Sequence, residues 1–185
     1  VSPSGTALQP GRRWRGLDAP VPSGKATPRF DFRVGIPDGS LFPVDVWRRL
    51  YGRCSLEAHT GRYGDPAGEP RLRAAVARHA AMARSLRAGA DDVVITHGAQ
   101  QALDLVGRVL IEPGDVVAVE EPGYPPARQL FATMGAEIAP VAVDGEGIVV
   151  GDIPMGTKLV YVTPSHQFPL GTPMTIPGYG EGVAA

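Results

Sequence analysis

The chain has 185 residues, of which 43% are hydrophobic and 20% charged, and its formal net charge is −1. This length allows one domain or parts of two, and the composition is that of a globular protein. No apolar run reaches about 18 residues and the start lacks the apolar stretch of a secretory signal, so we expect a cytoplasmic protein with no membrane partner. A single cysteine excludes an internal disulfide, and the four scattered histidines lack the spacing of metal ligands.

The first 30 residues are rich in Pro, Gly, Ser and Arg and have neither a strand nor a helix period, which predicts a linker. Arg and Lys outnumber Asp over residues 1–53, and such a basic arm can lie beside nucleic acid, although a solvated linker has the same composition. Pro43 suits the first turn of a helix. Its predicted apolar face consists of Val46, Trp47, Leu50, Tyr51 and Cys54. A second helix, over residues 69–86, would place inward Leu72, Ala75, Val76, His79, Ala80 and Ala83.

Short β-branched runs alternate with helical stretches from residue 91 onward. The predicted strands are Asp92–Thr96, Asp115–Glu120, Ala136–Val143 and Lys158–Thr163, and the predicted helices are Gly98–Glu112 and Tyr124–Gly135. This order predicts an α/β fold with a mainly parallel sheet and helices on both faces. Ligands of such sheets bind beyond the carboxyl ends of the strands, so the loops after Thr96, Glu120 and Thr163 are the candidate site.

Each of these loops carries a modest signal of its own. Gly98 precedes a helix whose first N–H groups and dipole favour an anion, although a tight strand-to-helix connection has the same sequence. Tyr124 could stack on a planar cofactor, or be a half-buried turn aromatic. His166 lies in a polar loop between two prolines, where a solvated histidine is equally typical.

The combination of motifs is more specific than any single loop. The runs YGDPAGxxxLR from Tyr63, ITxGAQQALDL from Ile95, EEPGY from Glu120 and TPSHQFPLG from Thr163 occur in that order. In order and spacing they resemble the class I/II aminotransferases of fold type I. The AQQ and SHQFPxG segments, with GIPD and LFP near residues 35–43, are most similar to the aminotransferase-like domain of MocR-type regulators of the GntR superfamily. The resemblance covers residues 31–175.

The resemblance implies part of the large domain of that fold, with pyridoxal 5′-phosphate (PLP) as cofactor. It implies cofactor-binding roles for Gly98, Ala99, Gln100, Tyr124, Tyr63, His166 and Gln167. The first three would hold the phosphate, and Tyr124 would stack on the pyridine ring. Tyr63 would reach the phosphate of a neighbouring subunit, which implies a homodimer, while His166 and Gln167 would line the outer face of the cofactor.

Two departures from the family pattern are informative, and the first of them favours the regulators. Aminotransferases commonly have an Asn that bonds the ring hydroxyl of the cofactor, and here the corresponding residue is Phe168, which cannot make that bond. The family also needs a Schiff-base lysine, an aspartate for the pyridinium nitrogen and an arginine for the substrate carboxylate. Lys25 and Lys158, the two lysines present, lie outside the family's lysine context. We therefore expect no catalytic residue and no transaminase activity in this chain alone.

The sequence further suggests a fragment, since the chain starts at a Val and residues 176–185 do not resemble the family. The regulators carry an upstream winged-helix domain, through which alone we expect contact with DNA, and an amino acid or amine would be the effector. A fragment of a stand-alone aminotransferase and an unrelated nucleotide-binding α/β domain are the alternatives. We expect marginal stability or aggregation of the isolated chain, because strand Asp92–Thr96 would lack its usual neighbour.

Overall fold

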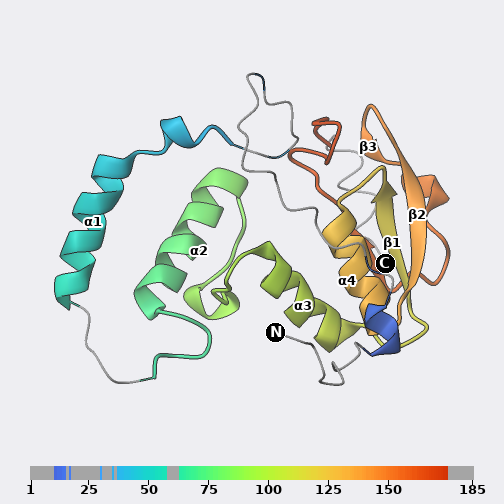
Figure 1. Ribbon diagram of the computed structural model, residues 1–185, viewed down its shortest axis with the longest axis horizontal. Coiled ribbons are helices and arrows are strands. Elements are labelled where there is room, and N and C mark those ends of the chain that lie inside the picture. The colour runs from blue at the N-terminus through green and yellow to red at the C-terminus, as the bar shows by residue number, and fades with distance from the viewer. Residues whose placement is uncertain are drawn as a thin grey trace, which may run out of the picture. The chain divides into compact units, whose positions relative to one another are not determined.

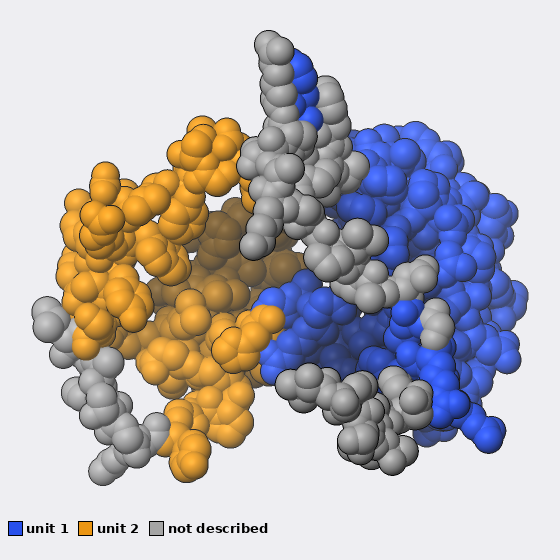
Figure 2. Space-filling model, viewed as in Figure 1, with its two compact units in different colours: residues 1–34, 98–185 blue, residues 35–97 orange. Residues whose placement is uncertain are grey.

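The computed structural model describes residues 11–15, 17, 30, 35, 37–57 and 63–174 (Figure 1). The chain divides into two compact units, Gly35–His97 and a second unit made of Val1–Val34 with Gly98–Ala185 (Figure 2). Most of the predicted linker, and all of residues 176–185, lie outside the described residues. Among the described residues, no helix combines the length and the apolar character that crossing a membrane requires.

The unit Gly35–His97 contains both helices predicted for the first half of the chain. A 3-10 helix, η2 (Gly39–Leu41), precedes α1 (Val44–Glu57), and α2 (Pro70–Arg84) follows. Asp38 caps η2, where the Ser40 N–H donates to its carboxylate over 2.9 Å and the hydrogen bonds from Ser40 lower the Asp38 pKa. The predicted apolar face of α1 exists as a stripe that is exposed in this structure, formed by Val46, Trp47, Leu50, Tyr51 and Cys54.

The buried side of α2 differs from the prediction. Of the residues predicted to point inward, Ala80 is half-buried, and the exposed ones are Leu72, Ala75, Val76, His79 and Ala83. The buried residue is Ala77, on the same side as Arg73, whose side chain is 12% exposed. The Arg73 guanidinium donates to the Asp65 carboxylate over 3.1 Å and to the Ala90 carbonyl over 3.4 Å. Polar contacts of one arginine therefore orient this helix, and apolar periodicity alone does not reveal them.

The strand predicted at Asp92–Thr96 is wrong. The 3-10 helix η3 (Ala90–Asp92) occupies its start, and Val93 is extended without belonging to a ladder of the described residues. The Ile95 N–H donates to the Ala67 carbonyl over 2.8 Å. Gly68, at φ +106°, lies so close to Ile95 that an added Cβ would be 2.6 Å from the Ile95 Cβ. The sequence has strand propensity, but a strand also needs a neighbouring strand to pair with.

The second unit contains a four-stranded sheet in the order β3-β2-β1-β4. Its strands are β1 (Val116–Glu121), β2 (Glu137–Asp144), β3 (Gly147–Ile148) and β4 (Leu159–Tyr161). Strand β1 is parallel to both β2 and β4, and β3 is antiparallel to β2. The mainly parallel sheet is thus confirmed, and the short β3, which follows a tight turn, was not predicted.

The sheet has a separate apolar core on each face. Helix α4 (Pro125–Met134) packs on one face, and α3 (Ala99–Leu110) lies against α4 (Figure 1). In the core on this face, Phe131 and Ala127 lie against Val117 and Val119, and Leu103 of α3 packs against the same core. On the other face, Ala118, Val141 and Ile148 are covered by Val150, Ile153, Val162 and Met174. This second cover includes the 3-10 helix η4 (Val150–Asp152). Among the described residues, α-helices cover one face of the sheet, so the prediction of helices on both faces holds for that face. The link from β3 to β4, on the other face, is too short for a helix of several turns.

The C-terminal end of α4 contacts the start of the chain. Gly135, at φ +95°, ends the helix in the left-handed conformation that glycine adopts readily. The 3-10 helix η1 (Arg12–Trp14) lies beside this end, and Arg13 donates to the Met134 carbonyl over 3.3 Å. A guanidinium is favourable there because the last carbonyls of a helix carry partial negative charge. The described residues 11–15 are thereby attached to α4.

Candidate functional site

Tyr124 lies at the carboxyl end of β1, where the sequence predicts ligand binding. Strand β1 ends at Glu121, and Pro122 and Gly123 turn the chain into α4, for which Tyr124 is the N-cap residue. A Cβ at Gly123 would lie 2.2 Å from the Glu120 carbonyl oxygen, so the turn is too tight for any larger residue. The Tyr124 side chain is half-buried and packs against the core under α3 and α4.

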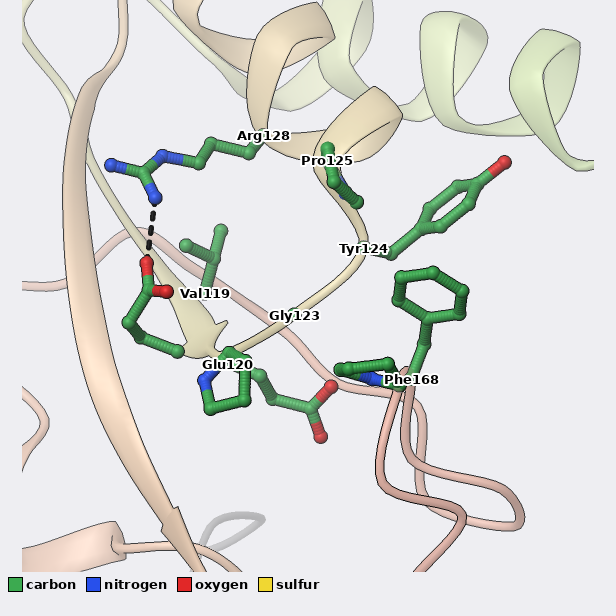
Figure 3. A pocket seen from close by; sticks show the side chains of 10 residues that line it. Val119, Glu120, Gly123, Tyr124, Pro125, Arg128 and Phe168 are labelled. Atoms are coloured by element: carbon green, nitrogen blue, oxygen red, sulfur yellow. Dashed lines mark hydrogen bonds and ion pairs between the residues drawn. The ribbon is translucent and has the colours of Figure 1, made fainter. Parts of the chain in front are cut away.

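A cleft of about 260 Å³ opens beside this turn (Figure 3). Tyr124 and Phe168 form its aromatic wall, with ring centroids 5.6 Å apart and planes at 78°, an edge-to-face contact. Arg128 lines the cleft and pairs with Glu121 over 2.6 Å, with both side chains about half exposed. The cleft therefore joins an aromatic surface suited to a planar ring with a solvated ion pair.

Glu120 is buried behind the same turn, with 3% of its surface exposed. Its carboxylate accepts hydrogen bonds from the Thr163 N–H over 3.2 Å and from the Thr163 hydroxyl over 2.6 Å. The Gln167 amide donates to Glu120 over 3.4 Å and to the Pro122 carbonyl over 2.7 Å. These bonds tie the loop of residues 163–171, called the 163–171 loop below, to the end of β1.

The predicted phosphate loop begins α3. Gly98 is the N-cap at φ +88°, and its Cβ position faces open space, with no atom within 4 Å. The first turn of α3 has no acidic residue, and the backbone N–H groups of Ala99 and Gln100 have no acceptor inside the helix. One turn further along, Leu103 packs against the same core as Tyr124. Donors, dipole and open space suit a phosphate, so the residues present fit the anionic end of PLP.

The other predicted site residues lie in different environments. His166 is exposed, in the 163–171 loop next to the buried Gln167. Gln167 is 3% exposed, and its amide is engaged by Glu120 and the Pro122 carbonyl. Tyr63 belongs to the other unit, where its side chain is fully exposed. Their cofactor roles stay predictions, and Tyr124 is the predicted residue that lines the cleft.

Sequence reasoning missed three residues of this region. Glu120 ends a run of buried strand residues, and an acid in such a run is a signal that it is hydrogen-bonded. Thr163 and Tyr161 carried no signal of their own. Burial, and after it the nearby Tyr124 and Glu120, raise the pKa of the Tyr161 phenol.

Comparison with known proteins gives a consistent result. Residues 29–151 match the family described as aminotransferase class I and II. The chain is 35% identical to the probable rhizopine catabolism regulatory protein MocR of Rhizobium meliloti, over 90% of this chain and 35% of that protein. It is 33% identical to aromatic-amino-acid aminotransferase 1 of Thermococcus litoralis, over 76% of this chain and 36% of the enzyme.

A solved structure shares the fold. It is LysN, the α-aminoadipate aminotransferase of Thermus thermophilus, complexed with N-(5′-phosphopyridoxyl)-L-leucine. It matches with a TM-score of 0.70 and 30% identity, over 80% of this chain and 38% of the enzyme. The chain thus spans about a third of the length of the curated relatives it matches. The match over residues 29–151 and the shared fold confirm the predicted resemblance: this chain belongs to the class I and II aminotransferase family.

Proposed function

We propose that this chain is part of the PLP-binding, aminotransferase-like domain of a MocR-type transcriptional regulator, acting in the cytoplasm. One observation carries the proposal: an aromatic wall of Tyr124 and Phe168 at the carboxyl end of β1. Tyr124 offers a ring to the cofactor, and Phe168 takes the place of the asparagine that aminotransferases commonly use. The similarity to the probable regulatory protein MocR supports the same assignment.

The cofactor would be held by backbone and ring contacts. The N–H groups at Gly98, Ala99 and Gln100 would bind the phosphate at the start of α3, where the helix dipole favours negative charge. Tyr124 would pack against the pyridine face, and His166 and Gln167 would border the outer side. Tyr63 would complete the phosphate site of a second subunit in a homodimer. When bound, PLP supplies an electron-withdrawing ring and an aldehyde that reacts with amines.

Lys158, the lysine that the structure describes, lies away from the predicted cofactor site. Lys158 directly precedes β4, and its N–H donates to the Val116 carbonyl over 2.8 Å at the start of β1. Because β1 and β4 are parallel, Lys158 lies at the amino ends of these strands, whereas Tyr124 lies at the carboxyl end of β1. Lys25 lies outside the described residues. We therefore propose that this chain binds PLP without forming a Schiff base and has no transaminase activity alone.

In the whole protein, this domain would sense an amino acid or amine and control DNA binding by an upstream winged-helix domain. The test on the present chain is a PLP titration by equilibrium dialysis, followed by borohydride reduction and mass spectrometry. Tyr124→Ala should weaken binding by about fivefold, the equivalent of one aromatic contact, whereas Tyr51→Ala on α1 should not.

Two results would contradict the proposal. Absence of saturable PLP binding by the folded chain would remove the cofactor assignment. A reduced, stoichiometric PLP adduct on Lys25 or Lys158 would overturn the non-covalent mode and favour the stand-alone aminotransferase.

A further inference from the structure

We propose that Glu120 is a positioning residue for the cofactor cleft, acting through Thr163 and Gln167 to hold Phe168 edge-on against Tyr124. Glu120 also lines the cleft (Figure 3), but its carboxylate is bonded to Thr163 and Gln167 and is not part of the aromatic wall. It would set the tilt of the Tyr124 ring by fixing the 163–171 loop behind it. The part of this inference that concerns PLP rests on the proposed function, and the part that concerns the ring contact does not.

The Glu120 carboxylate is the acceptor in each of its three hydrogen bonds. One carboxylate oxygen accepts from the Thr163 N–H, and the other accepts from the Thr163 hydroxyl and the Gln167 amide. An ionised carboxylate is an acceptor at both oxygens, which matches three donors. An amide at this position would place an N–H₂ group against at least one of these donors. The site therefore distinguishes Glu from Gln, although the two side chains have the same shape.

The Thr163 hydroxyl links Glu120 to Phe168 by hydrogen bonds. Its hydroxyl has one hydrogen, which is donated to Glu120 over 2.6 Å, so its lone pairs are left to accept. The Phe168 N–H donates to this hydroxyl over 3.1 Å. Two consecutive hydrogen bonds thus connect the Glu120 carboxylate with the backbone of the residue whose ring contacts Tyr124.

Gln167 closes the loop from the other side. Both amide hydrogens are used, by Glu120 and the Pro122 carbonyl, and its side-chain oxygen accepts from the Leu170 N–H over 3.1 Å. Its backbone N–H donates to the Thr172 carbonyl over 3.1 Å, and its carbonyl accepts from the Gly171 N–H over 2.6 Å. With every polar group of a buried side chain engaged, Gln167 acts as the anchor of the loop rather than as a flexible ligand.

The test reads the ring contact directly, without cofactor. The five tyrosines of the chain are replaced by 3-fluorotyrosine, and Tyr124→Phe assigns the ¹⁹F resonance of Tyr124. Phe168→Leu then gives the position of this resonance without the ring current of Phe168. Glu120→Gln and Thr163→Val should each move the resonance most of the way to that position. Thr163→Ser, which keeps the hydroxyl, should restore it.

A matched control separates positioning from general loss of stability. Thr133 is buried and its hydroxyl donates to the Leu130 carbonyl over 2.6 Å, so Thr133→Val removes a comparable bond far along α4. It should lower the unfolding temperature and leave the Tyr124 resonance and PLP affinity unchanged. Glu120→Gln should also weaken PLP binding by about threefold, less than the loss expected for Tyr124→Ala, because the ring is misplaced and not removed.

The outcomes are distinguishable. An unchanged Tyr124 resonance in folded Glu120→Gln and Thr163→Val overturns the positioning role. If Glu120→Gln does not fold, the comparison of Thr163→Val with Thr163→Ser decides the same question. If the resonance moves as expected but the wild-type chain binds no PLP, the positioning of Tyr124 stands and the proposed cofactor function fails.

Discussion

Gly123→Ala tests the turn that presents Tyr124. The new Cβ would lie 2.2 Å from the Glu120 carbonyl oxygen and 2.9 Å from its carbonyl carbon, and both are backbone atoms that cannot rotate away. The contact must lengthen by about 1 Å, and overpacking of this kind costs about 2 kcal/mol. Loss of chain entropy in the unfolded state returns about 0.5 kcal/mol, so we expect a net destabilisation of about 1.5 kcal/mol.

Gly145→Ala is the matched control for this substitution. Gly145 belongs to the same unit, has no atom within 4 Å of an added Cβ and is not in the left-handed conformation. It should stabilise the protein by about 0.5 kcal/mol. Urea denaturation followed by far-ultraviolet circular dichroism should therefore separate the two variants by about 2 kcal/mol. Equal stabilities would show that the turn relaxes freely and that the close approach at Gly123 does not affect the free energy of unfolding.

Three further predictions concern other parts of the molecule. The raised pKa of Tyr161 keeps its folded phenol protonated while the unfolded chain ionises, so stability is present below about pH 10 and falls as the pH rises through the folded pKa. Urea titrations from about pH 8 to about pH 11 should show this fall, and it should be smaller in Tyr161→Phe; an equal fall in both would contradict the assignment. Arg73→Met should lower the unfolding free energy by about 1 to 2 kcal/mol in the same assay, because the Asp65 and Asp91 carboxylates and the Ala90 carbonyl lose their partner. An unchanged value would show that these contacts are not stabilising. Arg13→Ala should release η1 from the Met134 carbonyl, so acrylamide should quench Trp14 more strongly in a protein whose single tryptophan is Trp14. Unchanged quenching would refute a stable contact.

The sequence was most informative for elements whose pattern of apolar residues is visible within a single segment. Strands β1 and β2 and helices α3 and α4 were predicted within a residue or two at most ends, because buried runs and amphipathic periods are properties of single segments. Asp92–Thr96 failed because strand formation depends on a partner that its own sequence does not supply. The inward face of α2 failed because the Arg73 contacts, and not its apolar residues, set the orientation.

The candidate site shows the same division. Tyr124 was predicted from its place after β1, and it lines the cleft. The bonds of Glu120 to Thr163 and Gln167 join residues that are 43 and 47 positions apart, and no local pattern records such a pairing. An acidic residue at the end of a strand is also common on surfaces, so burial alone distinguishes Glu120 from Glu121, its exposed neighbour.

Helix α4 connects the cleft with the N-terminal segment, because its two ends contact different parts of the protein. Its ten residues span about 15 Å, with Tyr124 beside the cleft at one end and the Met134 carbonyl bound to Arg13 at the other. A helix is stiff along its axis, so a tilt about its middle displaces the two ends in opposite directions by equal amounts. Any change that moves the Tyr124 ring by tilting α4 must therefore also lengthen or shorten the hydrogen bond between Arg13 and the Met134 carbonyl.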